Sequence, residues 1–580
     1  MGMADLFAWR DAQAEAEVFA AISDAEPRAL VNRFAELVRE TGTEDERLAA
    51  EYISDRLGRL GIQHEVHRPT LFISRPRPSS LTVDGRAYRA KTPAMAPSTD
   101  GRELTGPLVY VETGYAADTA GIFDTAEVHA DLRGKIALTD GLPMPAKVKQ
   151  LTDNGALAAV FVMPGEGIHE GICTTIWGAP DLDNWGAQPT LPIVSVAHGD
   201  GQALIAALRG GARLAASVAT RLETQWEPCP VVVAEIPGTD DPERFVLLHG
   251  HYDSWHQGIG DNATGDALLL EVARVLAARG SGRLRRTLRI AWWPGHSTGR
   301  YAGSTWYADR FALDLAANAV AQVDCDSPGC RWATEYRGLA CMAALYPMTA
   351  AAVRDATGLA STRERPNRAG DYSFNNLGLP ATLMLSSTMP EAVARAHGYY
   401  PVGGCGGNIA WHTEDDLLDI ADFGNLVRDA RVYAAVVMRL CNAPVHPIDL
   451  GAELDEAAAA LAAYRAAAPG LDLAAVDAAA GRLRQAVAGW AAGGDAEARN
   501  AAMRRASRLV VRSNYARLDP FRQDPALEVP PLPDLEPALR LPKLAAASHE
   551  AHVTATHLMR GANRVAALWD EAARELEAAR

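Results

Sequence analysis

The chain has 580 residues, a mass of 61.9 kDa and a hydrophobic fraction of 48%. At about 150 residues per domain this length predicts three or four domains, and the ordinary balance of apolar and charged residues excludes a disordered or fibrous protein. The 56 Lys and Arg residues against 72 Asp and Glu give a net charge of −16, which argues against a general nucleic-acid binder.

Cysteine usage and apolar runs bear on the cellular compartment. The seven cysteines are odd in number and have no repeating spacing, so they do not form the pattern typical of a secreted disulfide framework. The segment Met1–Glu17 lacks a basic stretch followed by an apolar one, and no run of about 18 uncharged apolar residues occurs. We therefore expect a cytoplasmic protein with no signal peptide and no membrane span.

The first 225 residues predict helices followed by a β-rich region. Residues 11–60 predict two helices, the second over Glu44–Leu60, where apolar side chains recur at helical spacing before Gly61. Residues 101–225 predict a compact α/β or β-rich domain, because short apolar runs there are separated by Gly, Asp and Pro. The runs lie at 108–111, 135–138, 158–163 and 191–196, with a helix expected at 146–154.

The remainder of the chain predicts an α/β domain and then a helical one. Strands are expected at 245–248, 287–293 and 319–323, with a helix at 265–278, and this alternation is typical of a mostly parallel sheet flanked by helices. The Ala-rich C-terminal part predicts long helices at 457–468, 475–491 and 549–578, which form either an oligomerisation bundle or a helical cover on the core.

Histidine and aspartate follow the ends of several predicted strands. In chain order they are His249, His251, Asp253, Asp261, His296, Asp324, Asp326 and, before a later helix, His412. In open α/β sheets the ligand crevice lies outside the carboxyl ends of the strands, so we expect these side chains to converge. Imidazole and carboxylate together suit zinc or a similar divalent ion. Singly each has another explanation: Asp261 can cap a helix and Asp324 can pair with an arginine.

The segments around these residues resemble the M28 metallopeptidases, in particular the branch with glutamate carboxypeptidase II and the transferrin receptor. The matching segments are His251–Ser254, Gly260–Gly265, Gly303–Ser304 with Trp306, Val323–Asp324 and His412–Asp416. The resemblance implies a zinc-exopeptidase-like domain in residues 1–100 and 226–445. It also implies an inserted protease-associated domain at 101–225 and a helical domain at 446–580 that forms a homodimer.

The resemblance implies two zinc ions and assigns their ligands. His251 and Asp324 would hold one ion, His412 would hold the other, and Asp261 would bridge them. Asp253 would orient His251. Such a centre polarises a carbonyl and activates water. The implied activity is hydrolysis of a peptide or amide bond in a small substrate, with neither nucleic acid nor a membrane as partner.

One departure from the family removes its general base. The family carries two adjacent Glu before its Gly-Ser element, the first as general base and the second as ligand of the second zinc. Here the segment Pro294–Ser304 contains no carboxylate, and alignment places either His296–Ser297 or Ser297–Thr298 at the pair. Three interpretations stay open: His296 is the second-metal ligand, His296 is the base, or the second site is empty.

Other positions leave the reaction open. Trp411 stands where the carboxypeptidase branch has a Tyr that stabilises the oxyanion, and an indole N–H can donate one hydrogen bond there. His256, Arg300 and Tyr301 are candidates for contacting substrate, with a packing or surface role as the alternative. Two rival hypotheses therefore stand beside the peptidase: another metal chemistry (amidase, cyclase or lyase), and a catalytically inactive binding protein.

Overall fold

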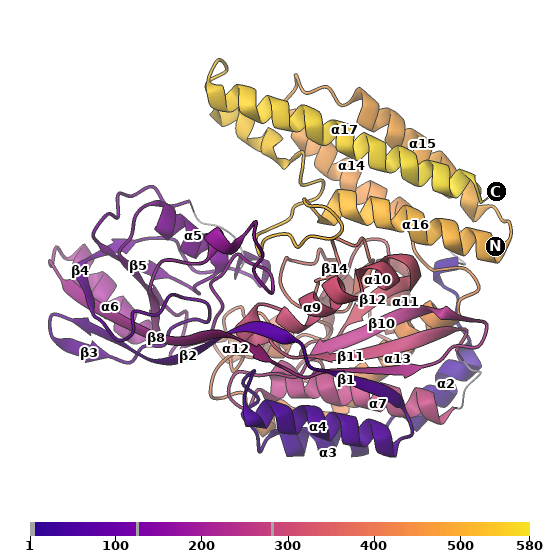
Figure 1. The fold of residues 1–580 in the computed structure, drawn as a ribbon, viewed down its shortest axis with the longest axis horizontal. Coiled ribbons are helices and arrows are strands. Elements are labelled where there is room, and N and C mark those ends of the chain that lie inside the picture. The colour runs from indigo at the N-terminus through magenta and orange to yellow at the C-terminus, as the bar shows by residue number, and fades with distance from the viewer. Residues whose placement is uncertain (1–5, 123–126, 280–283, 580) are drawn as a thin grey trace.

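The computed structural model describes residues 6–122, 127–279 and 284–579. Its central sheet has six strands in the order β1-β9-β11-β10-β12-β15 (Figure 1). The strands are β1 (Gln63–His67), β9 (Val231–Ile236), β10 (Asp241–His251), β11 (Arg286–Trp293), β12 (Ala319–Asp324) and β15 (Ala381–Thr382). The pairs β10–β11, β10–β12 and β12–β15 are parallel, and β9 is antiparallel to β1 and β11. The expected mostly parallel sheet is confirmed.

Helices cover both faces of this sheet, which explains why its strands are continuous apolar runs. On one face α7 (Thr264–Ala278) and α13 (Phe423–Asn442) pack with side chains such as Val246 and Leu248. On the other face α9 (Ala302–Arg310) and α10 (Ala312–Asn318) pack with Phe245 and Leu247. Successive residues of β10 thus enter opposite layers of the core, as the strand period of two requires.

The N-terminal region differs from the expectation of two helices. It forms α2 (Ala12–Ala21), α3 (Ala25–Phe34) and α4 (Glu44–Arg59). Proline lacks an N–H and fits only the first turn of a helix, so Pro27 forces a new helix to begin close before it. The predicted helix over Glu44–Leu60 is confirmed as α4, and the Thr43 side chain caps it by accepting a hydrogen bond from Glu46 N.

A second sheet has the strand order β3-β2-β8-β4-β5-β6-β7 and lies at the left of Figure 1. It comprises β2 (Thr70–Val83), β3 (Arg86–Tyr88), β4 (Leu104–Val111), β5 (Ile136–Asp140), β6 (Ala158–Val162), β7 (Ile193–Val196) and β8 (Ala215–Pro228), with α5 (Pro145–Asp153) and α6 (His198–Arg209). The four apolar runs and the helix at 146–154 are confirmed. The predicted boundary at residue 101 does not coincide with this sheet, because β2 and β3 precede it.

The ribbon formed by β2 and β8 joins the two sheets. Near its start Leu71 and Ile73 pack with Ala302 of the central domain. Near its end Leu81 and Val83 enter the core of the second sheet. Because β2 pairs with β8 along its whole length, apart from one irregularity, the two domains share one continuous ribbon.

The C-terminal region is helical, as expected. The predicted helices correspond to α14 (Leu450–Ala467), α15 (Ala474–Ala491) and α17 (His549–Glu577). A further long helix, α16 (Ala496–Tyr515), was not expected, because its buried face includes arginines. Among them, Arg508 donates to the carbonyls of Leu315 and Gly378 and so ties α16 to the central domain.

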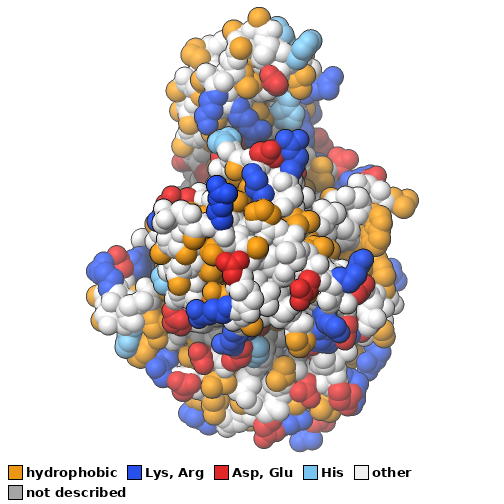
Figure 2. Space-filling view, turned by 90° about the vertical axis from the view of Figure 1, so that its left-hand side faces the viewer, with side chains coloured by type: hydrophobic (Ala, Val, Ile, Leu, Met, Phe, Trp, Pro, Cys, Tyr) orange, Lys and Arg blue, Asp and Glu red, His pale blue; other side chains and the backbone are white. Residues whose placement is uncertain are grey.

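The molecular surface on the side of the second sheet carries both positively and negatively charged side chains. Figure 2 shows Lys and Arg interspersed with Asp and Glu there. Within the described residues, no helix combines the length and apolar character needed to cross a membrane.

Candidate metal centre

The parallel register of β10 and β12 decides which carboxylate faces His251. His249 stands opposite Asp324 in that register. Side chains two residues apart on a strand point to the same face, so two further steps bring Asp326 to His251. His251 Nε2 lies 3.8 Å from Asp326 Oδ2, whereas Asp324 Oδ1 lies 3.4 Å from His249 Nδ1. The structure therefore places Asp326 beside His251, in the position that the sequence analysis gave to Asp324.

Asp261 lies between the two histidines that were expected to hold different ions. Its Oδ1 is 3.0 Å from His251 Nε2, and its Oδ2 is 3.0 Å from His412 Nε2. Asp261 belongs to the turn η3 (Ile259–Ala263) that precedes α7, and its peptide bond to Asn262 is cis. The Asp416 carboxylate holds this turn by accepting the N–H groups of Gly260 and Asp261 at 2.7 and 3.0 Å. The structure thus brings together His251, Asp261 and His412.

Backbone carbonyls orient both imidazoles toward Asp261. The Nδ1–H of His251 donates to the carbonyl of Asp253 at 3.0 Å, and that of His412 donates to the carbonyl of Glu170 at 3.0 Å. The Asp253 carboxylate also lies 3.6 Å from His251 Nδ1. Because Nδ1 carries the donated proton, the Nε2 lone pair is free to face Asp261. Glu170 comes from the second-sheet domain, so both domains build the centre.

The charges of the centre are strongly coupled. Burial opposes ionisation of Asp261, but His251 and His412 hold its pKa well below the usual range. Burial likewise opposes protonation of His251, but Asp253, Asp261 and Asp326 raise its pKa well above the usual range. His251 Nε2 and Asp261 Oδ1 are both buried and lack a hydrogen bond, although they are close together. Buried nitrogen and oxygen donors that converge without hydrogen bonds fit a divalent metal such as zinc.

His296 joins the side of the centre that holds His251. It begins α8 (His296–Gly299) after β11, and its ring stacks on that of His251 at 3.7 Å between centroids. Donor atoms of His251, His296 and Asp326 all lie within 4.8 Å of one another. Asp253 accepts the N–H groups of His296 and Ser297 at 3.1 and 2.9 Å, which fixes the start of α8. His296 is therefore grouped with His251 and Asp326.

The Asp371 carboxylate and the Ser304 hydroxyl hold the His296 ring in place. His296 Nδ1 lies 2.7 Å from Asp371 Oδ2, and the Ser304 hydroxyl donates to Asp371 Oδ1 at 2.5 Å. This arrangement fixes the His296 ring and leaves its Nε2 free. The sequence analysis missed Asp371 in this role, because Asp371 lies far along the chain from His296.

Trp411 packs on a histidine of the centre. Its ring stacks on that of His412, with centroids 3.8 Å apart and an interplanar angle of 18°. Gly404 allows this, because a Cβ there would approach Trp411 Cδ1 to 2.6 Å. The contacts describe a packing role for Trp411, and its predicted role toward an oxyanion stays a prediction.

His169 secures the loop that carries His412, and its burial makes the loop sensitive to acid. Its Nδ1–H donates to Trp411 O at 2.6 Å, and its Nε2 lies 2.7 Å from the Tyr400 hydroxyl. Burial lowers the pKa of His169 from 6.5 to about 4. The folded pKa is below the unfolded one, so its stabilising contribution is present above pH 6.5 and is lost as the pH falls toward 4.

We expect wild type to lose about 2–3 kcal/mol more unfolding free energy than His169→Gln between pH 7 and pH 4.5. Urea denaturation at both pH values measures this difference. Equal losses in the two proteins would contradict the assignment.

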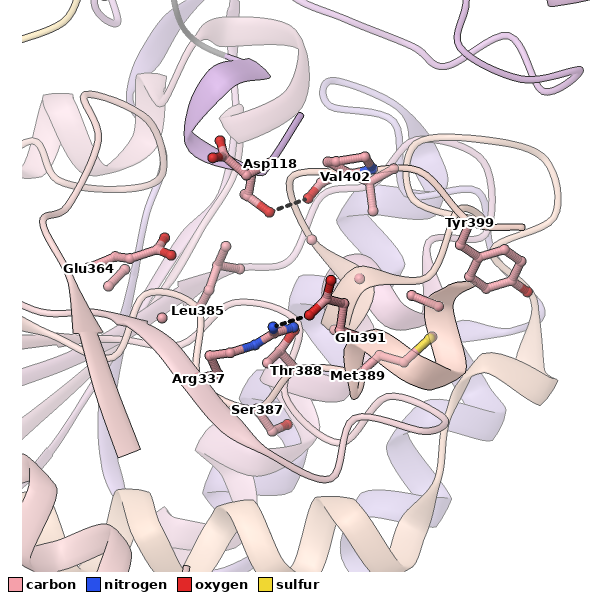
Figure 3. A pocket seen from close by; sticks show the side chains of 18 of the residues that line it. Asp118, Arg337, Glu364, Leu385, Ser387, Thr388, Met389, Glu391, Tyr399 and Val402 are labelled. Carbon is pink, nitrogen blue, oxygen red and sulfur yellow. Dashed lines mark hydrogen bonds and ion pairs between the residues drawn. The ribbon is translucent and has the colours of Figure 1, made fainter. Parts of the chain in front are cut away.

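A cavity of about 500 Å³ lies between the second-sheet domain and the central domain (Figure 3). The segment Ala117–Thr119 of the second-sheet domain forms one wall, and residues 384–407 of the central domain form much of the rest. Gly404, which packs on Trp411, lines the cavity. Met384 also lines the cavity, and its side chain lies so close to Gly370 that a Cβ on Gly370 would clash with it. Its charged lining is mixed: Asp118, Arg337, Glu364 and Glu391 are labelled in Figure 3. The cavity has space for a small molecule, and its lining residues are other than the donors of the centre.

Comparison with known proteins relates the chain to one family of peptidases. Residues 231–437 match the family model described as "Peptidase family M28". "Probable leucine aminopeptidase 2" of Aspergillus fumigatus is 29% identical over 262 residues, 44% of this chain and 48% of that protein. "Probable glutamate carboxypeptidase VP8" of Zea mays is 25% identical over 354 residues, 50% of this chain and 48% of that protein. The chain therefore spans about half the length of these curated relatives.

A solved structure supports the fold. The zinc aminopeptidase BSAP from Bacillus subtilis has a TM-score of 0.53 and 19% identity, over 72% of this chain and 95% of that chain. At this identity the likeness shows a shared α/β fold.

Proposed function

From the Peptidase family M28 domain that the chain contains in residues 231–437, we propose that this protein hydrolyses a peptide or amide bond in a small substrate with the help of two zinc ions. The observation that carries the proposal is the placement of Asp261. Each of its carboxylate oxygens lies 3.0 Å from the Nε2 of a different histidine, which is the arrangement of a ligand shared by two ions.

The donors divide into two groups around Asp261. His251, His296 and Asp326 would hold one ion together with Asp261, and His412 would hold the other with the second oxygen of Asp261. This division moves His296 from the second ion, where the family's Glu would stand, to the first. When bound, zinc supplies Lewis acidity that polarises a substrate carbonyl and makes water acidic near neutral pH.

The protein's own residues hold these donors in place. Asp253 and Asp371 fix the imidazoles of His251 and His296, and the carbonyl of Glu170 fixes that of His412. Partners of this kind set the tautomer and orientation of metal-binding histidines. The stacked ring of Trp411 and the surrounding buried side chains limit water around His412, which strengthens electrostatic interactions there.

The choice between two neighbouring aspartates tests the ligand assignment. We expect Asp326→Asn to lower bound zinc by about one ion per chain, because the amide loses the charge that a zinc ligand supplies. Asp324→Asn is the matched control, since Asp324 is buried, lies two residues before Asp326 and faces His249. Mass spectrometry of the native proteins measures the metal content. Loss of zinc in Asp324→Asn alone would restore the original assignment of Asp324.

Hydrolysis itself is tested with the zinc-loaded protein on aminoacyl p-nitroanilides, dipeptides and dipeptide amides. The proposal expects turnover of at least one of these substrates, its loss after chelation and its return with zinc. Bound zinc without turnover of any of them would favour a different metal chemistry such as an amidase, cyclase or lyase. Absence of bound metal would favour a binding protein.

We also propose that the second-sheet domain is a protease-associated domain. We further propose that the protein acts in the cytoplasm, as a homodimer that forms through its C-terminal helices. All seven cysteines are free and buried, which fits a reducing compartment. Exposed apolar side chains on the C-terminal region, Leu539, Val553 and Met559, fit a surface that meets another chain. Sedimentation of the purified protein tests the dimer.

A further inference from the structure

Arg300 carries a buried guanidinium that no carboxylate of the described residues pairs with. Its Cζ lies 5.2 Å from the centroid of the Tyr301 ring. The residue is 3% exposed, its Nε is buried with no hydrogen bond, and its guanidinium makes neither a hydrogen bond nor an ion pair within the described residues. By contrast, the buried guanidinium of Arg39 donates to the carbonyls of Tyr252, Gln257 and Gly258. Burying an unpaired charge is unfavourable, so Arg300 indicates a missing anionic partner.

The backbone holds Arg300 in an unusual conformation next to the metal centre. Arg300 and Tyr301 have φ angles of +49° and +67°, a backbone region that residues other than glycine rarely adopt. Non-glycine residues in this region cluster at functional sites. The carbonyl of Arg300 accepts the N–H of Gly178 at 2.7 Å, and the Tyr301 ring meets His296 edge-on at 4.7 Å. Arg300 is thus anchored directly beside His296.

The second-sheet domain lies on the other side of Arg300. Burial raises the pKa of the Cys173 thiol to about 12, and the positive charge of Arg300 partly opposes this shift. Cys173 lies three residues after Glu170, whose carbonyl holds His412. Arg300 therefore lies next to both His296 and the second-sheet domain, to which Gly178 also belongs.

A second arginine nearby is already engaged. The Arg368 guanidinium lies 3.6 Å over the Trp177 ring and donates to the carbonyls of Tyr372 and Asp524 at 3.0 Å. The Tyr301 ring lies against the same Trp177 ring, with centroids 4.3 Å apart and planes tilted by 37°. Arg368 therefore serves the fold through hydrogen bonds that the Arg300 guanidinium lacks within the described residues.

We propose that Arg300 binds a carboxylate of the substrate. The planar guanidinium matches a carboxylate through two parallel hydrogen bonds, and burial strengthens that pair. The inference rests on the proposed hydrolase function and adds its specificity: the enzyme prefers substrates that carry a free carboxylate. Either the α-carboxylate of a C-terminal residue or the side chain of Asp or Glu supplies this group.

Three matched substrates separate these two sources. They are a dipeptide with a free C-terminus, the same dipeptide as its C-terminal amide, and a dipeptide amide with Glu in the second position. We expect Arg300→Met to raise KM for the carboxylate-bearing substrate by about 10- to 100-fold and to leave the neutral amide unchanged. Arg300→Lys is expected to recover part of the loss. The affected substrate identifies the source of the carboxylate.

Arg310→Met is the matched control, because Arg310 is exposed on α9. Equal changes on all three substrates, or no change on any, would overturn the proposal. Zinc content and circular dichroism of each variant verify that the centre and the fold persist.

Calorimetry separates this inference from the proposed function. Acetyl-alanine, acetyl-glutamate amide and acetyl-alanine amide are titrated into the zinc-loaded wild type and Arg300→Met. If no peptide is cleaved but wild type binds one of the two acids at least about tenfold more tightly than Arg300→Met does, the hydrolase proposal fails and the carboxylate site stands. If peptides are cleaved but both proteins bind the acids equally, the carboxylate site fails and the hydrolase stands.

Discussion

Replacing Asp261 by Ala is expected to remove both zinc ions and to lower kcat/KM on the order of 10⁴-fold. Asp261 is the one described side chain whose two oxygens approach the Nε2 atoms of both His251 and His412, each at 3.0 Å. Without that carboxylate, each ion would lose a charged ligand. Metal content by mass spectrometry and steady-state kinetics measure the two effects.

Asp266→Asn provides the control for this substitution. Asp266 is also buried and lies five residues further on, in α7, and burial raises its pKa well above the usual range. Neither oxygen of the Asp266 carboxyl group has a hydrogen-bond partner within the described residues, so we expect the zinc content and activity of Asp266→Asn to match wild type. Retention of two zinc ions in Asp261→Ala would contradict the shared-ligand assignment.

Replacing His296 by Ala is expected to remove about one zinc ion per chain and most of the activity. His296 is one of three residues with donor atoms within 4.8 Å of one another, and Asp371 fixes its ring. We expect Asp371→Asn to keep the ion at high zinc concentration but to weaken its affinity about 10- to 100-fold, as partners of metal-binding histidines do when they are replaced.

The outcome for His296→Ala distinguishes three roles for this residue: ligand, general base and structural support. Loss of one ion assigns His296 as a ligand. Full zinc content with activity lost contradicts that assignment and identifies His296 as the general base. Full zinc content with full activity gives it a structural role. Ser304→Ala is a milder companion, because Ser304 reaches His296 indirectly, through its hydrogen bond to Asp371.

Much of the fold was predictable because apolar runs and helix signals are local. The strand β10 and the helix α7 follow directly from a continuous apolar run and from helical spacing. The long ribbon of β2 and β8 was not, because pairing between strands so distant in the chain leaves no local pattern. The helix α16 was not predicted either, because the arginines on its buried face interrupt the apolar periodicity that indicates a helix.

The candidate centre was predictable in its residue types but not in its register. His251, Asp261 and His412 follow strand ends or precede helices, and the structure brings them together. The choice between Asp324 and Asp326 depends on how β12 pairs with β10, which the sequence does not reveal.

The supports of the centre are tertiary contacts between distant segments. Asp371 meets His296 across 75 residues, and the carbonyl of Glu170 meets His412 across 242. A single sequence carries no signal for such pairs, because the two members of each pair lie far apart in the chain.

The central claim is that two ions share Asp261, and anomalous diffraction at the zinc edge from crystals of the zinc-loaded protein tests it most directly. The account predicts two peaks on opposite sides of the Asp261 carboxylate, one among His251, His296 and Asp326 and the other beside His412. A single peak that leaves either oxygen of Asp261 without a metal neighbour, or no peak at this carboxylate, would contradict it.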